Sequence, residues 1–187
     1  MGEQSTEDYI HKHIQSVRKK MSEIAGIIVE RAEHHDESKL KDPEFSGFVQ
    51  MDKEPRYEYN SQGYKDKMKR FAWLFEHHWA NNRHHPEFFK NQGGFESQAN
   101  IVDIVEMLCD WTSYKKSISY TEAINIVHTQ CKRFHFSETM ENILLNTLRD
   151  YFVDFGGFKD LGKCDVKNDG YFHHSDKDYI PIVDEKA

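Results

Sequence analysis

The sequence predicts an all-α bundle. Apolar residues recur every three or four positions over most of the first 155 residues, and this period is typical of amphipathic helices. Histidine and acidic side chains gather near the ends of these stretches and along one of them. Together, the two observations predict several helices that assemble one polar centre.

The 187 residues suffice for one domain, and nothing in the composition requires a second. The net charge is −7 with Lys and Arg scattered among acids, which argues against an extended nucleic-acid surface. Three cysteines without a C-x-x-C pair argue against a disulfide framework and a thiolate zinc site. No signal peptide or membrane-spanning run is evident, so we expect a cytoplasmic protein that does not engage membranes and that is free to form an oligomer.

The first predicted helix begins near Ser5 and continues to about Ala32. Its apolar residues follow steps of four and three, which place them in one stripe: Ile10, Ile14, Val17, Met21, Ile24 and Ile28. At about 100° per residue, His13 lies roughly 60° from the direction of Ile10. His13 is therefore the histidine of this helix that is better placed to point inward, either as a ligand or as a half-buried core residue.

The next two segments are a loop and a second long helix. Residues 46–63 are rich in Pro, Gly, Tyr and charge and show no clear period, which favours a loop. A helical period returns over residues 64–83. Pro86 disfavours helix at His85, so a turn should carry His84, His85 and Glu87.

A third helix is expected over residues 100–116. Asp103, Glu106 and Asp110 are spaced three and four apart and share one face of it. Acids on a largely apolar helix need partners, because buried charges are paired or bind metal. Two further helices, 121–134 and 137–155, should complete a domain spanning residues 1–156. The remaining residues, 157–187, are expected to form an irregular tail docked on the domain.

Three segments in this order resemble a known pattern. Residues 34–40 (HHDESKL), 77–87 (HHWANNRHHPE) and 105–111 (VEMLCDW) look like the HD-x-S-K, H-x3-N-x-H-H and E-M-x-x-D segments of an uncharacterised HD-like family of bacteria and phages. More broadly, the order of histidines and aspartates resembles that of the HD-domain metal-dependent phosphohydrolases. The likeness covers about residues 13–111, and three ordered motifs are more specific than one.

The resemblance implies an HD-domain-like helical bundle in which His35 and Asp36 are adjacent metal ligands. A histidine of the first helix and an aspartate of a later helix would join them, and these carry over to His13 and Asp110. Asp103 shares the face of Asp110 and competes for the role, but the family motif has its acid after Glu-Met, which favours Asp110.

Mixed imidazole and carboxylate ligands suit one or two divalent ions of Mn, Fe, Co, Ni or Zn. Such a centre would activate water for attack on phosphorus. The expected metal ligands are His13, His35, Asp36, His78, His84 and Asp110. The expected catalytic residues are Asp36, Lys39 and His85, and the expected substrate contacts are Lys39, Asn82 and Arg83. The expected supporting residues behind the ligands are Glu106, Asp103 and Glu87.

The roles of three histidines, His78, His84 and His85, stay open. They could complete a second metal site or serve as phosphate ligand and general acid. The main functional hypothesis is a metal-dependent phosphohydrolase acting on a nucleotide or a similar small phosphorylated substrate. A di-iron oxygenase and a non-catalytic module braced by metal are the alternatives. Without any metal, Asp36 and Asp110 would simply pair with nearby cations.

Overall fold

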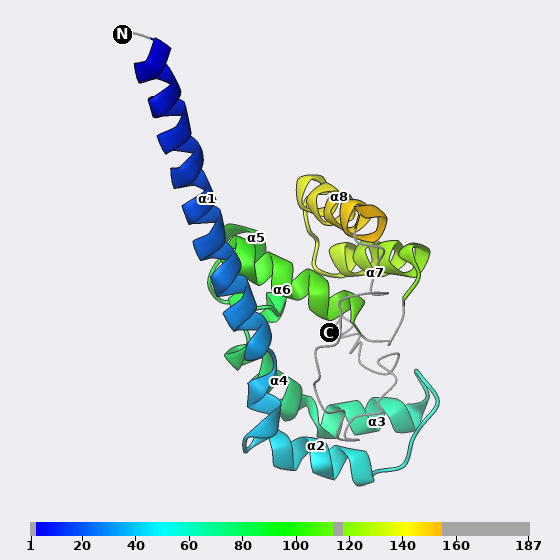
Figure 1. Ribbon diagram of the computed structural model, residues 1–187. Helices are drawn as coiled ribbons and strands as arrows, with labels where there is room; N and C mark the ends of the chain where they lie inside the picture. Colours follow the sequence, from blue (N-terminus) through cyan, green and yellow to red (C-terminus); the bar gives the residue numbers. More distant parts are fainter. Residues whose placement is uncertain (1–2, 114–117, 155–187) are drawn as a thin grey trace.

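The computed structural model describes residues 3–113 and 118–154, and all regular structure in these ranges is helical (Figure 1). The predicted all-α bundle is therefore confirmed. The predicted boundary at residue 156 and the predicted tail, 157–187, lie outside the described residues. None of the described helices is long and apolar enough to span a bilayer.

Helix α1 (Glu3–Glu33) is long, and its first half extends away from the rest of the molecule (Figure 1). The apolar stripe on this half faces solvent, with Ile10 50% and Met21 65% exposed. Only near Ile28, which is half-buried, does the stripe come under cover as α1 packs against α6 (Ile101–Thr112). The stripe therefore marks the core-facing side of α1 only in its last turns.

One core cluster holds together α2 (Glu44–Lys53), α3 (Gln62–Arg70) and α4 (Ala72–Asn81). Its buried residues are Phe48, Met51, Phe71, Leu74 and Phe75. Helices α2 and α4 approach closely at Gly47, where an added Cβ would lie 2.8 Å from the Leu74 side chain. The lack of a side chain at Gly47 thus permits this packing.

The predictions for this region were partly wrong. Residues 44–53 form a helix where a loop was expected from residue 46 onwards, because Phe48 and Met51 lie three apart and bury together against the neighbouring helices. The single helix expected over residues 64–83 is interrupted at Phe71, whose backbone leaves the helical region at φ −100° and ψ 11°.

A second core cluster joins η2 (Pro86–Phe89), α5 (Phe95–Gln98), α6, α7 (Tyr120–Arg133) and α8 (Glu138–Asp154). Its fully buried side chains include Phe89, Met107, Val127 and Leu144. Helices α7 and α8 match the two helices predicted over residues 121–134 and 137–155. Helix α6 ends at Thr112, four residues before the predicted end at 116, and residues 114–117 lie outside the described ranges.

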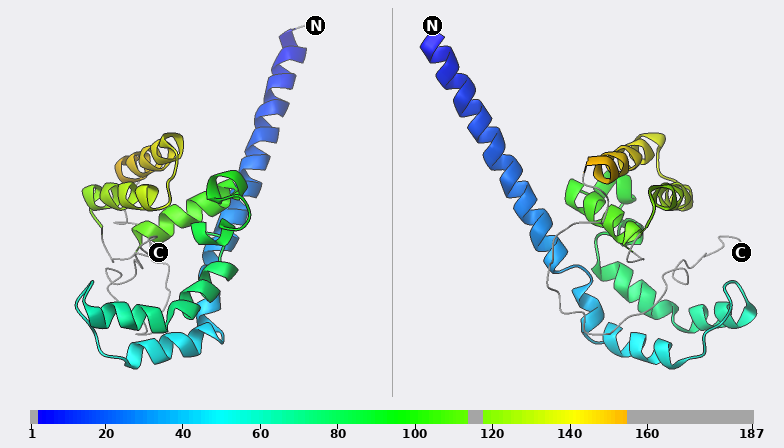
Figure 2. Two further views of the ribbon diagram at one scale, coloured as in Figure 1. Left: turned by 180° about the vertical axis from the view of Figure 1, so that it is seen from behind. Right: turned by 45° about the vertical axis from the view of Figure 1, so that its right-hand side comes forward.

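After α1 the chain turns and continues through a short segment into α2 (Figure 2). Asp36 adopts a left-handed conformation, with φ 56°, which aspartate tolerates better than most residues. The short helix η1 (Glu37–Leu40) follows and packs on α2 and α4, whereas α1 itself packs on α6. His35 and Asp36 are therefore placed where the elements of the two clusters meet.

Candidate metal centre

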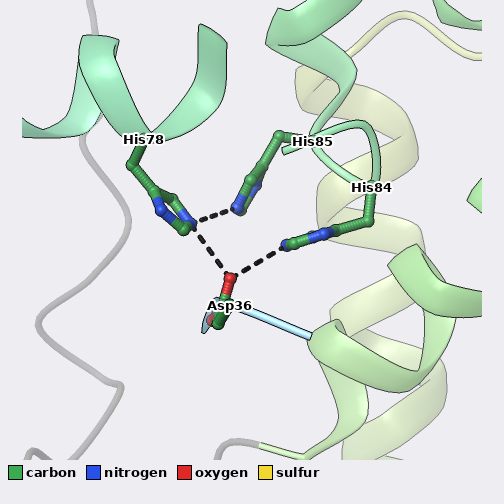
Figure 3. A group of neighbouring side chains, drawn as sticks. All are labelled: Asp36, His78, His84 and His85. Atoms are coloured by element: carbon green, nitrogen blue, oxygen red, sulfur yellow. Dashed lines mark hydrogen bonds and ion pairs between the residues drawn. The ribbon is translucent and has the colours of Figure 1, made fainter. Parts of the chain in front are cut away.

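The Asp36 carboxylate lies among the side chains of His35, His78 and His84. Its Oδ1 atom is 3.2 Å from Nε2 of His78 and 3.4 Å from Nε2 of His84 (Figure 3). Its Oδ2 atom is 3.4 Å from Nε2 of His35 and 2.6 Å from Nζ of Lys39. One carboxylate thus contacts groups from the turn after α1, from η1, from α4 and from the turn after α4.

Two overlapping groups of donor atoms are close enough to hold metal ions. Within each group, one donor atom from every residue lies within 4.8 Å of the others. The first group consists of Asp36, His78, His84 and His85, and the second consists of His35, Asp36, His84 and Asp110. Asp36 and His84 belong to both, so the geometry is compatible with one ion or with two neighbouring ions.

Two buried atoms at this centre lack hydrogen-bond partners among the described residues. They are Oδ1 of Asp36 and Nε2 of His84, which lie 3.4 Å apart. Buried polar atoms in proteins are nearly always satisfied, so each such exception needs a ligand or another explanation. A cation between the carboxylate oxygen and the imidazole nitrogen would satisfy both, and the nitrogen and oxygen donors suit a divalent transition metal.

Buried carboxylates orient the histidines. Nδ1 of His78 lies 2.8 Å from Oε2 of Glu44, and Nδ1 of both His35 and His84 lies 3.0 Å from Oε1 of Glu106. A carboxylate that accepts the Nδ1 proton leaves the lone pair on Nε2, which is the usual arrangement behind metal-bound imidazole. All three rings therefore direct an Nε2 atom to Asp36.

Glu44 is a residue of the candidate centre that sequence reasoning missed. Its side chain is fully buried and also accepts hydrogen bonds from Ser38 and from Nδ1 of His77, each over 2.8 Å. An acid in the first turn of a helix, directly after Pro43, is a common surface feature. The only available signal was Ser38 in the HD-x-S-K segment, which gave no indication of its partner.

The charges at the centre shift the pKa values of the histidines in opposite directions. Burial lowers the pKa of His35, but hydrogen bonds to Asp110 and Glu106 outweigh it and raise the pKa to about 10. Burial and the neighbouring His84 lower the pKa of His85 well below its ordinary value. At neutral pH the centre without metal therefore holds an imidazolium at His35 and a neutral ring at His85.

Burial raises the pKa of Asp36, but the adjacent His78 ring and the charges of Lys39 and His35 outweigh it and hold the pKa well below its ordinary value. Asp36 is consequently ionised over the whole physiological range. The Lys39 side chain is about one-third exposed (34%), so its ammonium group reaches the solvent edge of the centre.

The structure does not bring His13 to this centre, and its assignment as a ligand is wrong. His13 is exposed on the projecting half of α1. It lies 20 residues before the end of the helix, which at 1.5 Å per residue is about 30 Å away. His35, Asp36, His78, His84 and Asp110, by contrast, all fall in the two donor groups.

Asp103 and Arg83 pair with each other and lie outside the donor groups. The Asp103 carboxylate is fully buried and receives Nη2 of Arg83 at 2.8 Å and Nη1 of Arg31 at 3.1 Å. Asp110 is therefore the acid of α6 that belongs to a donor group. Arg83 fastens the turn after α4 to α6, and its predicted contact with substrate stays a prediction.

Asn82 and Glu87 also have structural partners. The Asn82 side chain donates to the His78 carbonyl at 2.8 Å and to Ser38 Oγ at 2.9 Å, so it holds the end of α4 against η1. Its predicted contact with substrate stays a prediction. Glu87 pairs with Arg133 of α7 at 3.1 Å, and burial raises its pKa.

These features define an all-helical protein with a candidate metal centre made of histidines and aspartates from α4, from α6 and from the turns that follow α1 and α4. The chain belongs to a family of unknown function (DUF5662), whose model matches residues 2–150. Searches found no match to a curated protein or to a solved structure.

Proposed function

We propose that this protein is a metal-dependent phosphohydrolase that cleaves a phosphate ester of a nucleotide or a similar small molecule. The observation that carries the proposal is the pair of buried, unsatisfied donor atoms on Asp36 and His84, which are the two residues common to both donor groups. The resemblance of the order of histidines and aspartates to that of the HD-domain metal-dependent phosphohydrolases supports phosphate chemistry.

A divalent ion at this centre would supply Lewis-acid stabilisation to a phosphoryl oxygen and to an attacking water. Lys39, at the exposed edge beside Asp36, would balance negative charge that develops on the phosphoryl group. Burial and the neighbouring His84 depress the pKa of His85 and keep its ring neutral at neutral pH, which is the form that can bind a metal ion. Glu44 and Glu106 would hold the liganding rings in place throughout.

The exposure of the centre supports a catalytic over a purely structural role. The side chains of His35 and Asp110 are each 30% exposed, although both belong to one donor group. A structural metal site is normally closed by protein ligands, whereas a catalytic site keeps a position open to water or substrate. The partial exposure argues against a module in which metal serves only as a brace.

A di-iron oxygenase is the second candidate, and the three imidazoles beside Asp36 in one donor group favour it. Imidazole-rich ligand sets suit iron and oxygen chemistry as well as hydrolysis. Stoichiometric iron together with substrate-dependent oxygen uptake would favour the oxygenase. Phosphate release that is equally fast without oxygen would exclude it.

The test of the main proposal is phosphate release from a panel of nucleotides and simple phosphate monoesters, with the protein loaded in turn with Mn²⁺, Fe²⁺, Co²⁺, Ni²⁺ and Zn²⁺. We expect Lys39→Ala to lower kcat about 100-fold, as for the loss of one group that stabilises transition-state charge. Lys41→Ala is the matched control, because Lys41 pairs with the exposed Glu37. Absence of phosphate release from the whole panel, with any of the five metals, would refute the proposal.

A further inference from the structure

A cleft of about 230 Å³ lies between α1 and α6 and opens beside the metal centre. One face of each helix lines it, with residues spaced three and four apart. Its lining residues are Ile28, Arg31, Ala32, His35, Val102, Val105, Glu106, Cys109, Asp110 and Ser113. His35 and Asp110 also belong to a donor group, so the cleft is continuous with the centre.

The two ends of the cleft differ in polarity. Arg31 pairs with Asp103, and four residues further His35 pairs with Glu106 and Asp110, so the contacts follow the same order along both chain segments. By this register, Ile28 and Val102 lie at one end of the cleft, and His35 and Asp110 lie at the other. The cleft thus leads from an apolar end to the metal ligands.

The cleft offers little to a second anionic group. Arg31 is the basic residue of the lining, and its two terminal nitrogens are already paired with Asp103 and Glu106. Glu106 and Asp110 add negative charge to the same walls. A ligand with several phosphates would place charge against these carboxylates without a free cation, whereas an uncharged apolar group would bury against Ile28 and Val105.

We propose that the cleft binds the uncharged, apolar part of the substrate, and that the substrate is a small ester with a single anionic head held at the metal centre. This inference rests on the proposed phosphohydrolase function and narrows its substrate class. The volume of the cleft is below the 300–1,000 Å³ typical of pockets for drug-sized ligands, so an apolar group of a few carbon atoms fits better than a nucleoside.

The test is isothermal titration calorimetry of methyl-, propyl- and pentylphosphonate with Mn²⁺-loaded protein. Each added methylene should tighten binding about threefold, as expected when a CH₂ group is partly buried.

The cleft variants give a second test. Val105→Phe should narrow the cleft and weaken pentylphosphonate binding at least tenfold. Cys109→Phe fills the same space from an exposed position of α6, so it tests the cleft even where Val105→Phe fails to fold. Val29→Phe, on an exposed position of α1 outside the lining, should bind like the wild type.

Several outcomes would overturn the cleft assignment. They are equal affinity for the three phosphonates, no binding of any of them to the Mn²⁺-loaded protein, and unchanged pentylphosphonate affinity in both cleft variants. The phosphohydrolase proposal fails separately. If affinity grows with chain length but no phosphate is released from any ester, the cleft assignment stands and the reaction is wrong.

Discussion

At the scale of single residues, Glu106 orients two histidines of the candidate centre. One of its oxygens lies 3.0 Å from Nδ1 of both His35 and His84, and its other oxygen pairs with Arg31. Burial raises its pKa, but the two histidines and the arginine outweigh burial and keep the carboxyl ionised. A single charge therefore sets the orientation of two rings.

We predict that Glu106→Gln will weaken metal binding about 10- to 100-fold, because removal of a carboxylate behind metal-bound histidine typically has this effect. The measurement is a competition titration against a chelator of known affinity. Glu30→Gln, at an exposed position of α1, is the control and should leave the affinity unchanged. Equal affinities of Glu106→Gln and wild type would show that the carboxylate does not support the ligands.

Sequence reasoning identified most residues of the centre because the motifs keep ligand-type residues close together along the chain. It could place His35, Asp36, His78, His84, His85 and Asp110 in one site without knowing the packing. It failed for His13, since the angular position of a residue on a helix does not show which part of that helix packs against other elements. It also missed Glu44, whose role depends on a contact with a residue 34 positions away.

At the scale of helices, Asp103 joins three elements. It accepts a hydrogen bond from the Asn100 backbone at the start of α6, and it pairs with Arg31 of α1 and Arg83 after α4. Burial raises the pKa of its carboxyl, but hydrogen bonds from Arg83 and from the Asn100 N–H outweigh this and hold the pKa below its ordinary value. The ionised form is thus favoured by folding.

We predict that Asp103→Asn will lower the free energy of unfolding by about 3 kcal/mol at pH 7, because it leaves two arginines without their shared carboxylate. The pKa of the Asp103 carboxyl is lower in the folded than in the unfolded protein, where it is about 3.9. The ionised carboxylate therefore stabilises the fold above about pH 3.9, and this stability is lost as the pH falls through the folded pKa. Urea unfolding between pH 7 and pH 3 should therefore show a shallower pH dependence in Asp103→Asn than in wild type.

Asp66→Asn is the control for this experiment, because Asp66 is exposed and accepts a hydrogen bond only within α3, from Gln62. Its unfolding curves should follow those of the wild type at every pH. A pH dependence of Asp103→Asn as steep as that of the wild type would contradict the assigned role of Asp103.

Helix α1 should behave as two segments. Residues 5–27 are exposed, whereas the last turns pack against α6 and carry Arg31. We predict that hydrogen exchange of backbone amides will be fast in residues 9–22 and slow in residues 28–33, because exposed helix without tertiary contacts opens readily. Equally slow exchange along the whole helix would show that another surface covers the apolar stripe.

The helices of the chain were predictable where burial follows the helical period. Helices α7 and α8 have regular core positions such as Val127 and Leu144, and their predicted limits agree with the structure. Helix α2 also buries positions at helical spacing, but two of them are Glu44 and Gly47, so the apolar residues alone show too little of the period to indicate a helix. The break at Phe71 likewise follows from tertiary packing, because that residue is buried between two helices of different direction.

At the scale of the whole molecule, the candidate centre lies between two separate core clusters. Helix α4, with His78, packs in one cluster, whereas α6, with Asp110, packs in the other. A metal ion held by residues from both sides would link the clusters, since binding to the folded state alone adds to stability. The sequence motifs indicated the candidate ligands but not this arrangement.

Elemental analysis of the purified protein tests the central claim most directly. We predict at least one equivalent of a divalent transition metal in the wild type and in His13→Ala, because His13 lies far from the centre. Asp36→Asn and His84→Ala should both lose the metal, since these residues are common to both donor groups. Wild-type protein without metal even after reloading, or full metal content in both Asp36→Asn and His84→Ala, would contradict the account.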